Sequence, residues 1–314
     1  MSRPSDRRGT AEVRVSAPAK INLCLGVGPV GADGFHPLAT VYQAVGIYDE
    51  VTLRPADTDL LTVSGDGVET GEVPLDGSNL ALRAVRLLAE HHGRDDLAVD
   101  MHIRKRIPVA GGLAGGSTDA AAALVGADAL FELQTPRAEL LELAGQLGSD
   151  VPFCVVGGTA MGAGRGEVVT PVMTRGEYWW LVVPDAAGLS TPSVYGEFDR
   201  LHADSPVPDP EIPDELLAAL RAGDVDRLGA ALTNDLQPAA LSFRSDLGHL
   251  IATGLAHGAR GGLVSGSGPT LAFLCQDPEH ARRLDESLQY ECDAFPGLVV
   301  KGPVPGARVV GARR

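Results

Sequence analysis

Residues 106–124 read "RIPVAGGLAGGSTDAAAAL", which places four glycines, two hydroxyl residues and an aspartate directly before a run of alanines. Glycine is costly to order, so a glycine cluster indicates unusual backbone angles or close approach by a ligand. Residues 97–108 alternate apolar and polar side chains, which is typical of a strand with one buried face. Residues 117–133 have a strong helix pattern. The sequence therefore predicts the order strand, glycine loop, helix.

This order favours a phosphate-binding site, because free N–H groups and the positive dipole end at a helix start attract anions. The glycines would let backbone amides turn inward, and the hydroxyls could bond phosphate oxygens. Asp119 would suit a helix cap or a magnesium ligand. A glycine loop with a capped helix and no ligand is the alternative, and it is the better interpretation of each residue alone. The residues that would form the site are Gly111, Gly112, Gly115, Gly116, Ser117 and Thr118.

Two familiar nucleotide motifs do not fit this loop. A Walker A loop requires a lysine after the glycines, and none follows them here. A dinucleotide fingerprint requires GxGxxG near the first strand, whereas this loop reads GGLAGG and lies in the middle of the chain.

Composition limits the partners. The chain has 314 residues and a net charge of -15, which argues against nucleic acid or an anionic membrane as the main partner. A small phosphorylated ligand remains compatible, since backbone amides can hold phosphate. No apolar stretch approaches the ~20 residues of a membrane span, and residues 1–10 lack the apolar segment of a signal peptide. The four cysteines lack metal-site spacing. We expect a cytoplasmic protein without a dedicated metal site.

Strand and helix patterns mix without strict alternation, which favours an α+β fold over a doubly wound sheet. Residues 12–28 predict two strands around a bend at Pro18, and a composition change near 170–180 suggests two domains, residues 10–174 and 175–314. Residues 189–213 are expected to form a surface excursion with a short helix at most. Further helices are predicted at 78–93, 136–148, 214–232, 247–258 and 277–289, with a strand, turn and strand at 259–274.

Two residues outside the loop are candidates for phosphoryl transfer, which needs a proton acceptor and a cation. Lys20 lies between apolar neighbours in "APAKINL", and Asp150 lies between "LGS" and "VPF". Taken alone, Lys20 fits a snorkelling edge residue and Asp150 fits a turn or cap. Spacing does not show that the two residues meet.

Three stretches together resemble the GHMP kinase superfamily: "APAKINLCL" (17–25), "PVAGGLAGGSTDAAAAL" (108–124) and "GLVSGSGPTLAFL" (262–274). The resemblance runs from about residue 13 to about residue 305. It implies two α+β domains with the site between them, the N-terminal half similar to ribosomal protein S5 domain 2 and the C-terminal half ferredoxin-like.

Two further stretches, "DGFHPLATVYQAV" (33–45) and "GSDVPFCVVGGTAMGAGRGE" (148–167), resemble one branch of this superfamily. Members of that branch phosphorylate a hydroxyl of a cytidine diphosphate-linked polyol in the non-mevalonate isoprenoid pathway. The cofactors implied are ATP and Mg²⁺, the metal held mainly through the ATP phosphates.

The resemblance implies a role for each matching residue. Asp150 would deprotonate the hydroxyl of the bound substrate, and Lys20 would orient Asp150 and neutralise charge. Asn22 would contact the substrate, Phe35 and Tyr195 would sandwich the cytosine, and His36 would bond its edge. Thr191 and Pro192 would lie beside Tyr195, and Asn79 and Leu80 would border the adenine. The ATP phosphates would be wrapped by Pro108, Val109, Ala110, Gly111, Gly112, Leu113, Ala114, Gly115, Gly116, Ser117 and Thr118.

This sequence differs from the family pattern at three positions: Ala114 replaces a glycine, Thr118 replaces a serine and Tyr195 replaces a phenylalanine. Two other functions stay open: another GHMP kinase, such as a homoserine or mevalonate kinase, and a nucleotide-binding regulator without transfer. A regulator would need neither Lys20 nor Asp150. Without the resemblance, the aromatic residues read as loop anchors and His36 as a turn histidine. A monomer or a homodimer is compatible with these features.

Overall fold

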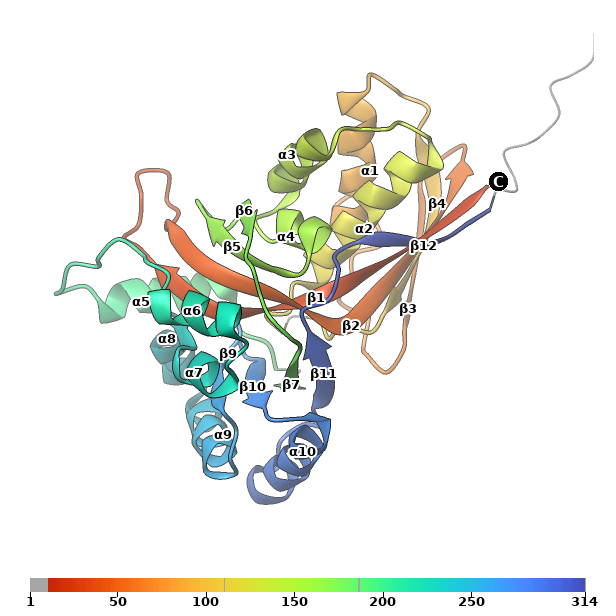
Figure 1. The fold of residues 1–314 in the computed structure, drawn as a ribbon. Coiled ribbons are helices and arrows are strands. Elements are labelled where there is room, and N and C mark those ends of the chain that lie inside the picture. The colour runs from red at the N-terminus through yellow and green to blue at the C-terminus, as the bar shows by residue number, and fades with distance from the viewer. Residues whose placement is uncertain (1–10, 110, 186, 314) are drawn as a thin grey trace, which may run out of the picture.

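The computed structural model describes residues 11–313 except residues 110 and 186, and two sheets organise these residues (Figure 1). The larger sheet is built on two long antiparallel strands, β1 (Glu12–Val27) and β2 (Leu38–Ala56). Its order is β12-β1-β2-β4-β3, with β5 pairing β2 and β6, and β8 pairing β1. The other strands are β3 (Leu60–Gly65), β4 (Ala98–Lys105), β5 (Thr159–Ala163), β6 (Val168–Pro171), β8 (Thr233–Asn234) and β12 (Arg308–Arg313).

Strand β1 corrects one expectation, because the two strands predicted around Pro18 are a single strand. The pairing with β2 shifts register between Pro18 and Ala19 and again between Asn22 and Cys24. A residue without an N–H group is tolerated at such an irregularity, so the proline bends the strand and does not end it. From Ala17 to Val27 the side chains are buried, because β1 is covered on both faces.

Four helices pack together against the larger sheet (Figure 1). In the helix that follows the glycine loop, nearly every residue from Thr118 to Ala127 is buried. Its small alanine side chains let it pack closely against neighbouring elements on several sides. The predicted order of strand, loop and helix is confirmed, as are the helices at 78–93 and 136–148. The helices are α1 (Leu80–His91), α2 (Gly115–Leu130), α3 (Arg137–Leu147) and α4 (Val151–Val156).

The second sheet has the order β11-β7-β10-β9 and is packed against α5, α8, α9 and α10. The 189–213 segment contains an 11-residue helix where a short helix at most was expected. The helix predicted at 214–232 is divided in two, because the first helix ends at Gly223. Among the elements that were not predicted are α8 and the last two strands. The predicted α+β class is confirmed. The strands are β7 (Tyr178–Val183), β9 (Gly261–Val264), β10 (Leu271–Cys275) and β11 (Leu298–Gly302). The helices are α5 (Thr191–Leu201), α6 (Asp214–Ala222), α7 (Val225–Ala230), α8 (Gln237–Phe243), α9 (Ser245–Ala256) and α10 (Pro278–Cys292).

The two sheets share a buried junction. Ile21 and Leu23 of β1 pack in one cluster with Trp180 of β7 and Ala272 of β10. Trp180 also donates its indole N–H to Gln43 Oε1 at 2.8 Å. The last strand, β12, returns to pair with β1 in the larger sheet. The two halves of the chain thus meet through an apolar core and share one sheet. The division into two domains at residue 174 stays a prediction.

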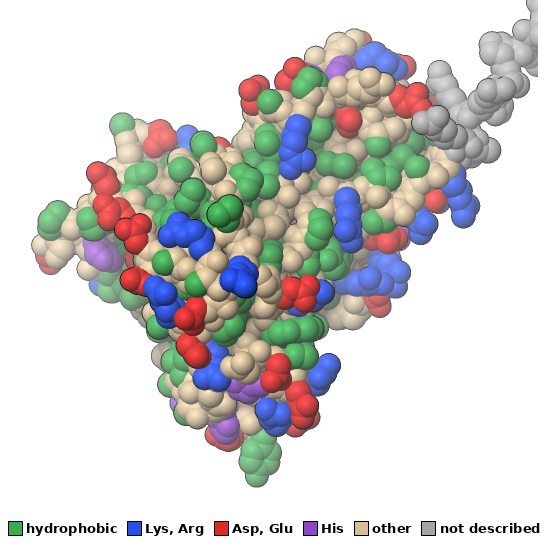
Figure 2. Space-filling view, in the orientation of Figure 1, with side chains coloured by type: hydrophobic (Ala, Val, Ile, Leu, Met, Phe, Trp, Pro, Cys, Tyr) green, Lys and Arg blue, Asp and Glu red, His purple; other side chains and the backbone are tan. Residues whose placement is uncertain are grey.

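Acidic and basic side chains are interspersed over the face drawn in Figure 2 and form no continuous basic region there. Across the described residues, no helix has both the length and the apolar character that crossing a membrane requires.

Candidate active site

A cavity of about 920 Å³ gathers residues from segments that are far apart in the sequence. Its wall contains parts of β1, the loop after β1, the glycine loop, the start of α4, the start of α5 and residues 266–268. The predicted site residues that line it are Lys20, Asn22, Phe35, His36, Gly111, Gly112, Ala114, Gly115, Gly116, Ser117, Asp150, Thr191, Pro192 and Tyr195.

Lys20 and Asp150 meet in this cavity, with 3.5 Å between Lys20 Nζ and Asp150 Oδ2. Lys20 is 5% exposed, so it is no snorkelling edge residue. Its ammonium donates to Asn22 Oδ1 at 2.8 Å, and the Asn22 amide donates to Thr40 Oγ1 at 2.8 Å. This chain of bonds holds the ammonium in one position. Asn22 therefore supports the cation, and its side chain also lines the cavity.

Asp150 occupies the N-cap position of α4, yet its side chain makes no capping hydrogen bond. The carboxylate lines the cavity, and its side chain is 29% exposed. Burial, with the charge of Asp150 as the next cause, raises the pKa of Tyr195 to about 12. Both effects also raise the pKa of Tyr42 well above its usual value. Two protonated phenols therefore lie near a carboxylate that is not used for capping.

The glycine loop presents free amides at the start of α2. The N–H of Thr118 donates to the Ala114 carbonyl at 2.8 Å, and the N–H groups of the three residues before it have no helical acceptor among the described residues. The backbone N–H of Lys20 donates to Leu113 O at 3.2 Å, which ties the loop to the strand that carries the cation. This geometry suits an anion beside Lys20.

A second glycine loop, residues 265–268, packs against the first. Ser265 Oγ donates to Gly112 O at 3.3 Å, and the amide of Asn234 donates to the carbonyls of Val264 and Gly266 at 2.7 and 2.8 Å. A Cβ built on Gly266 would lie 3.5 Å from Lys20 Nζ. The motif was part of the sequence resemblance, but its residues Gly266, Ser267 and Gly268 were not assigned to the site, although they line the cavity.

Two expectations about the start of α2 are wrong. The hydroxyl of Thr118 is fully buried and donates to Pro18 O at 3.0 Å, so it fastens α2 to β1 and does not face the cavity. Asp119 neither caps the helix nor lines the cavity, and it forms an ion pair with Lys105 at 2.6 Å. The reason is that α2 begins at Gly115, two residues before the predicted start.

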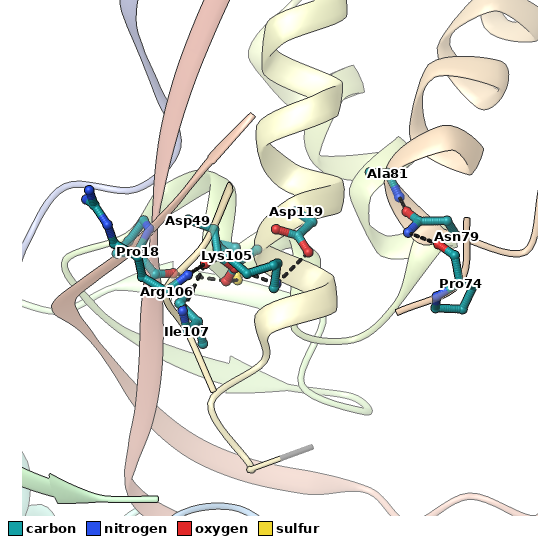
Figure 3. Close-up of polar contacts among 11 residues, drawn as sticks. Pro18, Asp49, Pro74, Asn79, Ala81, Lys105, Arg106, Ile107 and Asp119 are labelled. Carbon is teal, nitrogen blue, oxygen red and sulfur yellow. Dashed lines mark hydrogen bonds and ion pairs between the residues drawn. The ribbon is translucent and has the colours of Figure 1, made fainter. Parts of the chain in front are cut away.

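Other predicted nucleotide contacts lie at the edge of the described cavity or beyond it. Asn79 caps α1 by accepting from the Ala81 N–H at 2.9 Å, and its amide donates to Pro74 O at 2.8 Å (Figure 3). Leu80 Cδ1 would lie 3.8 Å from a Cβ on Gly116, so it is next to the glycine loop. Pro108, Val109 and the buried Leu113 do not line the cavity, and Ala110 lies outside the described residues.

Ala114 adopts the left-handed conformation, with φ 61° and ψ 32°, as the residue before α2. An L-residue with a Cβ pays roughly 1–2 kcal/mol in this region, and glycine does not. Glycine removes this strain, but it also gains freedom in the unfolded chain, which offsets part of the gain in stability. We therefore expect Ala114→Gly to stabilise the protein by about 0.5–1 kcal/mol, or about 2 °C in Tm. A thermal melt measures this, and an unchanged or lower Tm would show that Ala114 is unstrained.

A second part of the cavity is aromatic. The rings of His36 and Tyr195 lie 5.1 Å apart between centroids at an interplanar angle of 34°. His36 Nδ1 is 2.8 Å from the Gly28 carbonyl, which can only accept, so Nδ1 carries the hydrogen. In the neutral ring this leaves the lone pair on Nε2, which lies 3.6 Å from Asp199 Oδ1. Phe35 is 52% exposed at the rim.

Sequence reasoning missed Arg165, which lines the cavity beside Phe35. Its guanidinium carbon lies 3.8 Å from the centroid of the Phe35 ring, and Nη2 lies 3.0 Å from Asp33 Oδ2. The Phe35 N–H, with Arg165, holds the pKa of Asp33 below its usual value. Tyr42 and Asp199 were also missed. Arg165 lies in "GRGE" (164–167), at the end of one of the stretches that carry the family resemblance. Its positive charge in that stretch was the signal that could have identified it as a site residue.

The donor set fits the phosphates of ATP: three amides at a helix start, the Ser117 hydroxyl and the ammonium of Lys20. A Cβ on Gly112 would meet Ser265 O at 2.4 Å, so glycine there is what lets the two loops pack against each other. Among the described residues no group of three or more His, Cys, Asp or Glu side chains is arranged to hold a metal ion.

Residues 79–158 match the family model of the GHMP kinases N terminal domain, and residues 216–294 match that of the GHMP kinases C terminal region. A 4-diphosphocytidyl-2-C-methyl-D-erythritol kinase from a Nocardioides species is 54% identical over 295 residues, covering 94% of this chain and 98% of the relative. The kinase of the same name from Thermobifida fusca is 53% identical over 305 residues, covering 95% and 98%. A crystal structure of 4-(cytidine 5'-diphospho)-2C-methyl-D-erythritol kinase has a TM-score of 0.73 at 31% identity, covering 92% of this chain and 98% of that one.

Proposed function

The chain belongs to the GHMP kinases, and on that premise we propose that it transfers the γ-phosphoryl group of ATP to the 2-hydroxyl of 4-diphosphocytidyl-2-C-methyl-D-erythritol. The products are the 2-phosphate and ADP, in the non-mevalonate isoprenoid pathway. The family resemblance and the kinase class predicted from the sequence are confirmed by the relatives. The observation that carries the assignment of roles is the Lys20–Asp150 pair, 3.5 Å apart, between the glycine loop and the aromatic end of one cavity.

The proposed transfer uses the residues as follows. Asp150 accepts the proton of the substrate hydroxyl as that oxygen attacks the γ-phosphorus. Lys20, held by Asn22, orients Asp150 and balances the charge that develops on the phosphoryl oxygens. The free amides at the start of α2 bind the phosphates. Mg²⁺ carried on those phosphates would supply neutralisation of their charge. Alignment in the cavity supplies much of the rate.

The aromatic end of the cavity supports a cytosine site. With hydrogen on Nδ1, His36 can accept from the exocyclic amino group of cytosine through Nε2. Tyr195 offers a ring face near His36, and Phe35 offers a second one at the rim. A pocket that bonds the base edge rejects substrates without that edge, because its polar groups would stay unpaired.

Arg165 is expected to hold the Phe35 ring and the loop that carries it. In Arg165→Gln the contact over the ring and the ion pair with Asp33 are both lost. We expect KM for the cytidyl substrate to rise roughly five- to tenfold, with kcat and KM for ATP unchanged. Steady-state kinetics in both substrates measure this. Arg165→Lys should restore part of the affinity, and an unchanged KM for the cytidyl substrate would contradict the role.

The function is tested by an ADP-release assay with magnesium and ATP, comparing 4-diphosphocytidyl-2-C-methyl-D-erythritol with homoserine and mevalonate. Turnover with the cytidyl compound alone is expected. Turnover with another alcohol instead would support the assignment as a kinase and contradict the assignment of the cytosine pocket. ATP binding without turnover of any alcohol would point to a nucleotide-binding regulator.

The setting of the reaction is part of the same proposal. The net charge of -15 and the small-molecule cavity suit a cytoplasmic enzyme that acts on a free metabolite, without nucleic acid or membrane as partner. It would work as a monomer or a homodimer, with residues 10–174 as the ATP-binding domain and residues 175–314 as the second domain.

A further inference from the structure

Three ionisable side chains lie beneath the glycine loop and have no part in the transfer described above. They are Asp49 of β2, Lys105 at the end of β4 and Asp119 of α2, and each is at most 3% exposed. Lys105 Nζ lies 2.5 Å from Asp49 Oδ2 and 2.6 Å from Asp119 Oδ2. Figure 3 shows Lys105 between the two carboxylates. We call these three residues the buried cluster.

The buried cluster joins the two ends of the glycine loop. Asp49 Oδ1 accepts from the backbone N–H groups of Arg106 and Ile107 at 2.6 and 2.9 Å, and these residues lead into the loop. Asp119 belongs to the helix that follows the loop. A Cβ built on Gly115, the first residue of α2, would lie 3.2 Å from Lys105 Nζ. The ammonium is therefore a bridge between the strand before the loop and the helix after it.

The charges of the buried cluster are unequal, since one ammonium faces two carboxyl groups. Asp119 Oδ1 has no hydrogen-bond partner among the described residues. Burial raises the pKa of Asp119 well above its usual value, Asp49 adds to this, and Lys105 opposes it. Burial lowers the pKa of Lys105, but its two carboxyl partners outweigh burial and leave it raised. The neutral arrangement is thus a charged Lys105 with one carboxyl protonated.

Within the described part of the chain, the other groups around Asp119 do not compensate for its ionisation. The titratable groups that face it are Asp49 from β2, Lys105 from β4 and Cys154 from α4. Burial raises the pKa of the Cys154 thiol to about 12, so this thiol is neutral in the ordinary pH range. When Asp119 ionises, a net negative charge therefore appears beneath the amides that would receive the ATP phosphates.

We propose that Asp49, Lys105 and Asp119 are positioning residues that hold the glycine loop in its ATP-binding conformation, and that affinity for ATP falls when the buried cluster becomes negatively charged. The inference rests on the proposed function of the loop as the phosphate site. It concerns binding of ATP and not the identity of the alcohol.

The first test compares ATP binding by the full chain and by Asp119→Asn, using titration calorimetry with magnesium and ATP. The titrations are repeated at a series of pH values between the ordinary pKa of a carboxyl group and that of lysine. Asn keeps the shape and an oxygen for Lys105 but cannot ionise. Since Asp119 is neutral below its raised pKa, the parent protein should bind ATP less tightly as pH rises through that pKa. Asp119→Asn should lack this fall and bind roughly tenfold more tightly at the alkaline end. Coincident profiles would overturn the proposal.

Stability gives an independent reading of the same ionisation. A carboxyl whose pKa is raised on folding contributes stability that is present below the unfolded pKa and is lost as pH rises through the folded pKa. The melting temperature of the parent should fall over that range, and the Asp119→Asn protein should show less of this fall. Equal slopes in the two proteins would count against ionisation of Asp119.

The second test removes the cation. Lys105→Met leaves the buried carboxyl groups of Asp49 and Asp119 without their shared cation. It should raise KM for ATP at least roughly tenfold while kcat at saturating ATP is kept, the sign of lost binding rather than lost chemistry. Adding Asp119→Asn should restore part of the affinity. Arg244→Met is the matched control, because Arg244 also pairs with two carboxylates, Asp185 and Asp246, and does not line the cavity.

The outcomes separate this inference from the proposed function. The control should lose stability but keep ATP affinity. A folded Lys105→Met protein with unchanged KM and Kd for ATP would overturn the positioning role, and where that variant does not fold, Asp119→Asn decides. If the parent binds ATP with the expected pH profile but does not phosphorylate the cytidyl compound, the inference stands and the proposed substrate is wrong.

Discussion

Asp150→Asn is expected to lower kcat by roughly 10²- to 10⁴-fold while ATP binding stays almost intact. The amide has the shape of the carboxylate but cannot accept the hydroxyl proton. The side chain of Asp150 makes no capping bond with α4, so the substitution removes no structural hydrogen bond there. Its pairing with Lys20 at 3.5 Å is weakened, but Lys20 keeps its bond to Asn22.

Single-turnover and steady-state assays measure the loss, and calorimetry with ATP measures the binding. Asp226→Asn is the control, since Asp226 is an exposed residue paired with Arg260 and does not line the cavity. That variant should keep the parent's kcat. Turnover by Asp150→Asn within tenfold of the parent would show that another group takes the proton.

Gly112→Ala is expected to weaken ATP binding strongly and to destabilise the fold by roughly 2–4 kcal/mol. The residue has φ 75°, where an L-residue is strained, and its Cβ would lie 2.4 Å from the backbone oxygen of Ser265. Backbone cannot rotate away as a flexible side chain can. The two glycine loops would have to separate, and the amides at the start of α2 would lose their position beside Lys20.

Thermal melts and ATP titrations measure both effects. Gly116→Ala is the stability control, because it makes the same substitution four residues later, at the start of α2, where a Cβ would have ordinary contact, 3.8 Å from Leu80 Cδ1. Gly116→Ala should retain the Tm of the parent. If Gly112→Ala melts and binds ATP as the parent does, the packing of the two loops has no influence on the phosphate site.

Much of the local structure could be predicted from the sequence, because it depends on neighbouring residues. The alternation from Leu97 to Ile103 marks the buried face of β4, as the sequence predicts. The same alternation places Lys105 on the buried face of β4. A buried lysine needs an acidic partner, so the sequence could have predicted an ion pair there.

The start of α2 shows where local reasoning failed. The hydroxyl of Thr118 was expected at the phosphates, yet it donates to the carbonyl of Pro18, 100 positions earlier in the chain. Asp119 was expected as a cap or metal ligand and lies beside Lys105 instead. A hydroxyl or carboxylate bonds to whatever donor or acceptor the fold brings near it, and the helix pattern alone does not reveal that partner.

The sequence by itself determined the strand, glycine loop and helix, the α+β class, and the candidates Lys20 and Asp150. These follow from backbone preferences and from residue chemistry within a few positions. Only the tertiary structure decided that Lys20 and Asp150 lie 3.5 Å apart, that Arg165 covers Phe35, and which side chains lie under the loop. The physical reason is that β1, β2 and α2 pack against one another through the core, and this packing, not spacing along the chain, sets which distant side chains meet.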